Sequence, residues 1–194
     1  MMIRRRRATF AMLLAAIAGC GGPPRPHRAV GHSFPALPIR PLGAADRPAP
    51  TLAGRITLVN FWGPWCPPCR RELPELARLA ARLRDDPRFQ FVAVASAAGP
   101  GDEPELATDV KQFLSAEGLD IDVWAFTDPV ARLPFTAGGV TGPLLDAFPT
   151  TYLIATDGTV LHGWIGYREG VETEIATAVA TALRDVPTPA PPAP

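Results

Sequence analysis

The chain has 194 residues and a mass of 20.7 kDa, and its 47% hydrophobic against 20% charged residues exclude a chain that is disordered throughout. Basic and acidic side chains both total 19, so the formal net charge is zero and the strongly basic balance of a nucleic-acid-binding protein is absent. We therefore expect one globular domain with appendages and no nucleic-acid partner.

The first twenty residues have the layout of an export signal. Arg4 to Arg7 form a positive region, and an apolar stretch of about 11 residues follows that is too short to span a bilayer. The stretch ends in Ile17-Ala18-Gly19-Cys20, which resembles a bacterial lipobox, where the cysteine is lipidated and becomes the first residue after cleavage. We predict a lipoprotein signal peptide over 1–19 and lipidation of Cys20. Ordinary cleavage after Ala18, at a small-x-small site, is the alternative.

Two proline-rich segments flank the predicted domain. Residues 20–32 are rich in Gly, Pro and Arg without apolar periodicity, which indicates a tether whose extended reach is roughly 35 to 40 Å. Residues 186–194 contain five prolines and are predicted to be a disordered tail. The domain itself is assigned to residues 33–185.

Within the domain, strand-like and helix-like patterns alternate. Proline breaks the apolar pattern of 33–42, which allows at most a short edge strand. Apolar and β-branched runs predict strands over 56–61, 89–95, 123–126, 150–155 and 159–165, the last two joined by the hairpin signal Asp157-Gly158. Helical periodicity predicts helices over 73–83, 103–117 and 171–183, and residues 129–145 show no clear period. This order predicts an α/β fold with a mixed central sheet and helices on both faces.

A Cys-x-x-Cys pair lies between the first of these strands and its helix, in the segment Trp65-Cys66-Pro67-Pro68-Cys69. Unpaired N–H groups and the positive end of the dipole at a helix start favour a thiolate, and can lower a thiol pKa from about 8.5 to roughly 3.5 to 7.5. We therefore expect Cys66 to be the nucleophile and Cys69, one turn into the helix, to resolve a mixed disulfide. Pro67 and Pro68 suit the first helical turn and stiffen the loop.

Together with a second motif, Phe148-Pro149-Thr150-Thr151-Tyr152-Leu153-Ile154, this segment resembles the thioredoxin superfamily, most closely its TlpA/ResA-like branch of extracytoplasmic thiol-disulfide oxidoreductases. The resemblance covers about residues 33–184 and implies a thioredoxin-like fold. It further implies that Pro149 follows a cis peptide bond beside the disulfide and that the Phe148 backbone pairs with an extended client segment. Trp65, Pro67 and Pro68 would adjoin that client, with packing as the alternative role for Trp65.

One departure from thioredoxin concerns the proton on Cys69. Thioredoxin has a buried aspartate on the strand before the motif, whereas this chain has Asn60, which cannot exchange a proton. Glu72 lies three residues after Cys69, and a glutamate at this position is usual in the ResA-like branch. We interpret Glu72 as the acid/base that takes and returns the Cys69 proton. The alternative is that Glu72 is a solvated helix residue like Glu75.

These residues predict a protein-disulfide reductase whose only redox group is the Cys66–Cys69 disulfide, with no metal or other cofactor. It is expected to act as a lipid-anchored monomer in the periplasm or cell envelope, drawing electrons from a membrane thiol-disulfide donor. The resemblance suggests client thiols such as those of apocytochrome. A lipid-anchored copper chaperone and a redox-inert binding module are the alternatives. A thiol peroxidase is disfavoured, because Gly63 occupies the position where that family has threonine.

Overall fold

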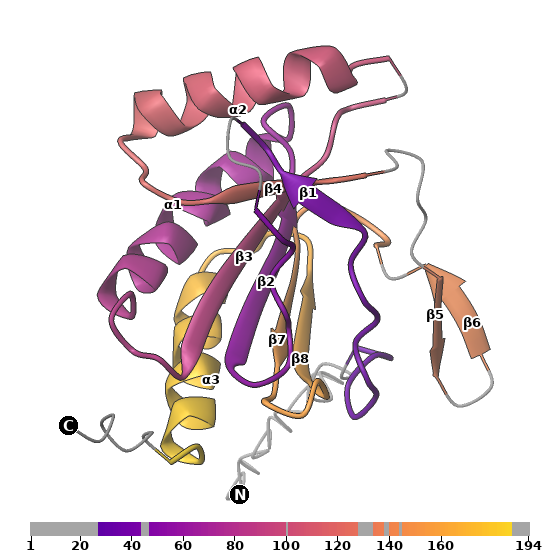
Figure 1. The fold of residues 1–194 in the computed structure, drawn as a ribbon, viewed down its shortest axis with the longest axis vertical. Helices are drawn as coiled ribbons and strands as arrows, with labels where there is room; N and C mark the ends of the chain where they lie inside the picture. The colour runs from indigo at the N-terminus through magenta and orange to yellow at the C-terminus, as the bar shows by residue number, and fades with distance from the viewer. Residues whose placement is uncertain are drawn as a thin grey trace, which may run out of the picture.

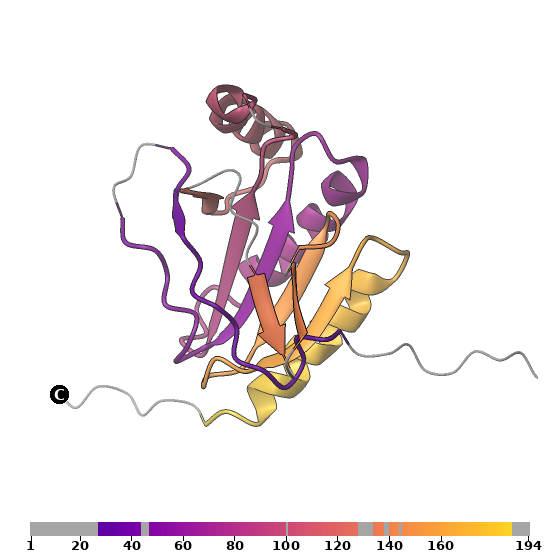
Figure 2. The same ribbon diagram turned by 90° about the vertical axis from the view of Figure 1, so that its right-hand side faces the viewer.

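A six-stranded sheet in the order β1-β4-β3-β2-β7-β8 forms the centre of the molecule (Figures 1 and 2). The structure, a computed structural model, describes residues 27–43, 47–99, 101–127, 134–137, 140–143 and 145–187. β2, β3 and β4 are parallel, whereas β1, β7 and β8 each run antiparallel to their neighbour. The mixed sheet expected from the sequence is confirmed. The strands are β1 (Ile39–Pro41), β2 (Ile56–Trp62), β3 (Phe89–Ala95), β4 (Val123–Phe126), β7 (Thr150–Ile154) and β8 (Val160–Ile165).

The helices α1 (Pro67–Arg82), α2 (Glu103–Glu117) and α3 (Val171–Arg184) all pack on one face of this sheet. Ile56 and Leu58 of β2 contact α1 and α3, and Trp62, on the same face of β2, contacts α2. The prediction of helices on both faces is therefore wrong for the described residues. Successive crossovers from β2 to β3 and from β3 to β4 step in the same direction, and right-handed crossovers in one direction place their helices on one face.

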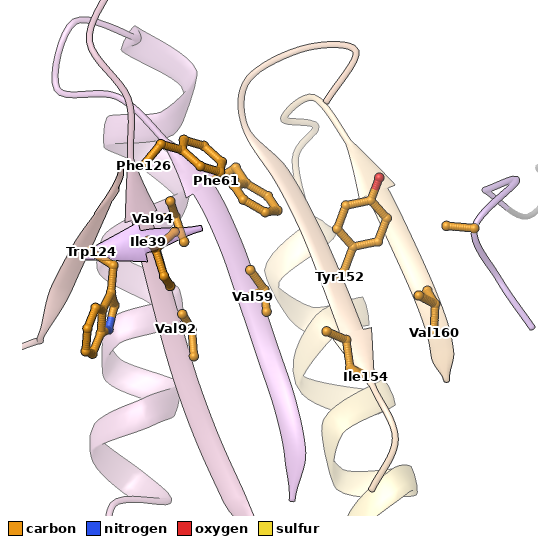
Figure 3. Packing of buried hydrophobic residues seen from close by; sticks show 11 residues of the cluster. Ile39, Val59, Phe61, Val92, Val94, Trp124, Phe126, Tyr152, Ile154 and Val160 are labelled. Carbon is orange, nitrogen blue, oxygen red and sulfur yellow. The ribbon is translucent and has the colours of Figure 1, made fainter. Parts of the chain in front are cut away.

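Among the described residues, the N-terminal segment and no helix covers the opposite face. Figure 3 shows its apolar side chains, among them Phe61, Phe126 and Tyr152, which form one buried cluster with Ala29. Ala29 is completely buried, and Val160 of β8 exchanges backbone hydrogen bonds of 2.9 Å with Gly31 and His32. Residues 27–32, assigned to the tether from their composition, therefore pack against the domain. Composition could not show this, because single residues such as Ala29 make the contact.

A small hairpin stands apart from the main sheet in Figure 1. It consists of β5 (Pro134–Ala137) and β6 (Val140–Pro143), paired antiparallel, in a region where the sequence predicted no regular structure. That prediction is wrong for these eight residues. The sequence did contain a signal for a two-residue hairpin turn, Gly138-Gly139, but no long apolar pattern flanks it, so it was not recognised.

The export signal, the lipidated Cys20 and the tail beyond residue 187 lie outside the described residues. Within the described ranges, no helix is both long enough and apolar enough to cross a membrane.

Candidate active site: a disulfide at the start of a helix

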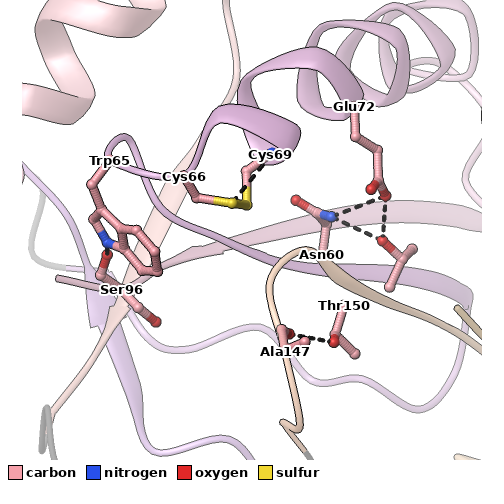
Figure 4. Close-up of a disulfide and its surroundings, with 9 residues drawn as sticks. Asn60, Trp65, Cys66, Cys69, Glu72, Ser96, Ala147 and Thr150 are labelled. Carbon is pink, nitrogen blue, oxygen red and sulfur yellow. Dashed lines mark hydrogen bonds between the residues drawn. A yellow bond between two sulfur atoms is a disulfide. The ribbon is translucent and has the colours of Figure 1, made fainter. Parts of the chain in front are cut away.

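Cys66 caps the N-terminus of α1, directly after the loop that leaves β2. Its Sγ accepts a hydrogen bond of 3.3 Å from the backbone N–H of Cys69, and Pro67 and Pro68 are the first two residues of the helix. The two cysteines form a disulfide with their Cα atoms 5.3 Å apart (Figure 4). Cys66 is 3% exposed and Cys69 is completely buried. The positive end of the α1 dipole and a backbone donor are thus both directed at the Cys66 sulfur.

The Trp65 side chain lies exposed at the surface next to Cys66. Its side chain is 43% exposed, and its indole N–H donates a hydrogen bond of 2.8 Å to the Ser96 carbonyl. Gly63 makes this arrangement possible, because a Cβ at that position would overlap the Trp65 indole. The neighbouring Trp62 is completely buried and lies against Phe113, so it packs the interior. An indole held in place at the surface supports a recognition role for Trp65.

The second sequence motif lies next to the first in space. The Phe148–Pro149 peptide bond is cis, as the resemblance implied. The Phe148 ring meets the Trp65 ring edge-on with centroids 5.5 Å apart, and it packs against the apolar cluster that contains both cysteines. Thr150 Oγ1 closes the turn by donating to the Ala147 carbonyl at 2.7 Å (Figure 4). The fold thus brings Trp65 and the Phe148–Pro149 bond to the same edge of the disulfide.

Glu72 is buried behind the disulfide, on the first turns of α1. It is 2% exposed, whereas Glu75, one turn further on, is exposed. Its Oε1 accepts hydrogen bonds from Thr151 Oγ1 at 2.7 Å and from Asn60 Nδ2 at 3.4 Å. Burial raises the pKa of Glu72 to about 7, against the Thr151 hydrogen bond, which lowers it, and with a smaller upward effect of Glu172. The alternative of a solvated helix residue is therefore contradicted. A carboxyl that titrates near neutral pH beside a redox pair suits proton exchange.

Thr151 was missed as a site residue by sequence reasoning. It pairs with Asn60 across β2 and β7, so both side chains point to the face that carries α1. Its hydroxyl accepts a hydrogen bond of 2.8 Å from Asn60 Nδ2 while it donates to Glu72. The alternation of the strand that follows Pro149 contained the signal, because it places Thr150 on one face and Thr151 on the other.

The raised pKa of Glu72 predicts a specific dependence of stability on pH. The ordinary value of 4.5 applies when the chain is unfolded, and the folded value is about 7. The free energy of unfolding is therefore highest below pH 4.5, where Glu72 is neutral in both states. It falls by about 3 kcal/mol in total as the pH rises from 4.5 through about 7, because the unfolded chain loses the Glu72 proton first. Glu72→Gln keeps the neutral form at every pH. We expect its unfolding free energy, measured in urea, to gain about this amount relative to the wild type between pH 4.5 and 8.

Glu105→Gln is the matched control for this measurement, because Glu105 is exposed on α2. Its curve should run parallel to that of the wild type. A constant difference between Glu72→Gln and the wild type over this range would show that folding does not raise the pKa of Glu72.

No group of three or more His, Cys, Asp or Glu side chains arranged to hold a metal ion occurs in the part of the chain that the structure describes.

A family model described as Redoxin matches residues 31–180. The chain belongs to the Redoxin family. Among curated relatives, the thiol-disulfide oxidoreductase ResA of Bacillus thuringiensis (strain Al Hakam) is 31% identical over 137 residues, which cover 71% of this chain and 70% of that protein. A thiol:disulfide interchange protein DsbE homolog of Paracoccus denitrificans is 34% identical over 118 residues, covering 57% of this chain and 51% of that protein.

A solved structure supports the same assignment of this Redoxin-family chain. A thiol:disulfide interchange protein of the thioredoxin family from Chlorobium tepidum TLS is similar with a TM-score of 0.54 and 26% identity, over 82% of this chain and 97% of that one. The thioredoxin-like fold predicted from the sequence is confirmed. With the cysteine pair in place and relatives of this activity, the protein is a thiol-disulfide oxidoreductase.

Proposed function

We propose that this oxidoreductase reduces the disulfides of client proteins outside the cytoplasm. The observation that carries the proposal is the placement of Cys66 as the N-cap of α1, with a backbone N–H on its sulfur and Trp65 exposed beside it. A thiolate is favoured there, and a client can reach Cys66 before it reaches the fully buried Cys69.

The reaction proceeds in two exchanges. In the first, the Cys66 thiolate attacks one sulfur of the client disulfide, the client S–S bond breaks, and the other client sulfur leaves as a thiolate that takes a proton. In the second, the deprotonated Cys69 attacks the Cys66 sulfur, the mixed disulfide breaks, and the second client thiol leaves. Two electrons pass to the client and the Cys66–Cys69 disulfide remains. A membrane-bound dithiol then returns the pair to its reduced state.

Glu72 takes the proton from Cys69 in the second step and can later return it. Its carboxylate lies beyond the Asn60 amide as seen from the disulfide (Figure 4), within hydrogen-bonding distance of that amide. The Cys69 proton reaches it through a rotation of the Glu72 side chain or through one water molecule. A carboxyl with a pKa of about 7 can both take and return this proton at neutral pH.

Client binding uses the edge formed by Trp65, Phe148 and Pro149, with the exposed Pro67 on the helix side. An extended client segment adds to the Phe148 backbone as a short strand and holds its disulfide over Cys66. Pro68, half-buried in the first turn, fixes the loop. Apocytochrome thiols are a client class that suits a reductase of this kind, and the protein acts as a monomer.

An insulin-reduction assay of the wild-type protein tests this proposal directly. In the presence of dithiothreitol it should accelerate the reduction of insulin disulfides severalfold over dithiothreitol alone. A copper chaperone using the same two cysteines would instead bind Cu(I) tightly in competition with a chelator and leave insulin reduction at the background rate. A redox-inert binding module would do neither.

The protein is anchored to the membrane by lipid on Cys20 after removal of 1–19. Because the described fold begins at His27, only seven peptide steps separate it from Cys20, and their full extension is about 25 Å. The docked N-terminal segment therefore keeps the domain closer to the membrane than a tether over 20–32 would.

Labelling of expressing cells with palmitate tests the anchor. The wild-type chain should take up label, and Cys20→Ser should take up none. A chain that carries no label in either form would contradict the lipoprotein proposal without touching the redox chemistry.

A further inference from the structure

The carbonyl oxygen of Asn60 is a buried hydrogen-bond acceptor with no partner in the described part of the oxidised protein. Asn60 is 1% exposed, and its Nδ2 donates to Thr151 at 2.8 Å and to Glu72 at 3.4 Å. Its Oδ1 is among the few buried side-chain polar atoms there without a hydrogen bond. Buried polar groups are nearly always paired, so such an atom calls for an explanation.

The chemistry of the neighbours fixes which end of the amide faces which way. The Thr151 hydroxyl has one hydrogen, and it donates this hydrogen to Glu72 Oε1. It can therefore only accept from Asn60, and only the NH₂ end of an amide can donate. With Glu72 ionised, a flipped amide would also place two acceptors, Oδ1 and the Glu72 carboxylate oxygen, against each other. The NH₂ end consequently faces Thr151 and Glu72, and the carbonyl end faces the other way.

The carbonyl end points toward the disulfide. In Figure 4 the Asn60 oxygen lies on the side of Cys69, and the nitrogen lies on the side of Glu72. In the disulfide state neither sulfur carries a hydrogen, so nothing on that side can donate to Oδ1. Reduction by two electrons breaks the S–S bond, and uptake of one proton leaves a thiolate at Cys66 and a thiol at Cys69, which is completely buried. The donor that Oδ1 lacks is then formed on the side to which Oδ1 points.

We propose that Asn60 is a positioning residue, whose Oδ1 accepts a hydrogen bond from the Cys69 thiol in the reduced protein. The bond exists only in the dithiol state, and it therefore favours that state over the disulfide. It also favours the thiol form of Cys69 over its thiolate, so that Cys66 is the sulfur left to carry the negative charge. Thr151 and Glu72 hold the amide from its other end and set its orientation.

The inference deepens the proposed function, since it rests on Cys66 and Cys69 as the reacting pair. It explains why an asparagine, which cannot exchange a proton, serves at this place on β2. Two side chains thus divide the work: Asn60 accepts a hydrogen bond from the Cys69 thiol, and Glu72 removes its proton.

Infrared spectroscopy of the S–H stretch tests the proposal on the chain lacking 1–19 and carrying Cys20→Ser, which leaves only the two active-site thiols. The reduced protein should show one S–H band at a frequency lowered by hydrogen bonding, and Cys69→Ser should remove it. Asn60→Leu, close in volume but without an acceptor, should move the band to the frequency of a free thiol. Thr151→Val is the matched control, because it loosens the same polar group yet leaves Oδ1 in place, and it should retain the lowered band.

A redox equilibrium with dithiothreitol gives the second readout. Loss of one hydrogen bond present only in the dithiol should shift the equilibrium of Asn60→Leu toward the disulfide by about fivefold, and Thr151→Val should shift it less. Equal shifts in both variants, or a free-thiol frequency in the reduced wild type, would overturn the proposal. If Asn60→Leu does not fold, the comparison of the wild type with Cys69→Ser still assigns the band to Cys69, and a free-thiol frequency for that band would overturn the proposal. Failure of the proposed function would appear differently, as a wild-type protein that does not reduce insulin.

Discussion

Cys66→Ser is expected to lower the protein-dependent part of insulin reduction at least about a thousandfold, because a serine hydroxyl does not form the nucleophile at neutral pH, so the observed rate should fall to that of dithiothreitol alone. Cys69→Ser is expected to behave differently. It keeps the nucleophile at the start of α1 but lacks the sulfur that releases the client, so a covalent complex through Cys66 should accumulate. Non-reducing gel electrophoresis with a disulfide-containing client detects this complex.

Each serine variant should be compared with the reduced wild type, because all three lack the Cys66–Cys69 disulfide. Similar circular dichroism and similar melting temperatures would show that the loss of rate is chemical. A complex trapped by Cys66→Ser but absent from Cys69→Ser would exchange the two roles, and it would contradict the order of exposure seen here, in which Cys69 is the more deeply buried of the pair.

Glu72→Gln is expected to remove the rise in rate near neutral pH. In the wild type, the Glu72 carboxylate forms as the pH passes through its pKa of about 7, and the resolving exchange should accelerate with it. Glutamine cannot take a proton, so the variant should resolve the mixed disulfide about tenfold to a hundredfold more slowly at pH 8 and show no inflection near 7. Stopped-flow measurement of the release of client from a preformed mixed disulfide isolates this step.

Glu105→Gln again serves as the control, and its profile should match the wild type. If Glu72→Gln were to retain an inflection near pH 7, the group responsible would be another one, and Glu72 would have a structural role only. The stability difference predicted for the same variant depends on the surroundings of Glu72, chiefly its burial, and does not require that Glu72 exchange a proton with Cys69.

The sequence was sufficient for the parts of the site that depend on local pattern. The strand before the motif, the helix after it and the Cys66 cap follow from apolar periodicity and from the preference of a helix start for proline and a polar cap. The cis bond before Pro149 came from a resemblance and not from a physical derivation. The strand–helix motif around Cys66 and the cis bond before Pro149 each lie within one short segment of the chain.

The features that were missed depend on contacts between distant segments. The hydrogen bonds among Asn60, Thr151 and Glu72 depend on the register of β2 against β7, which no single segment contains. The covering of the sheet by the N-terminal segment depends on small residues such as Ala29, which have no periodic signal. The sides on which the helices lie follow from the order of the strands, and this order was not part of the sequence prediction.

The reduction potential of the Cys66–Cys69 pair tests the central claim most directly. Equilibration of the full mature chain with defined ratios of oxidised and reduced dithiothreitol, followed by trapping of the free thiols, gives this potential. A protein that reduces clients should have a value near that of thioredoxin, about −270 mV. A value near −120 mV would identify a strong oxidant and would contradict the assignment of the protein as a reductase.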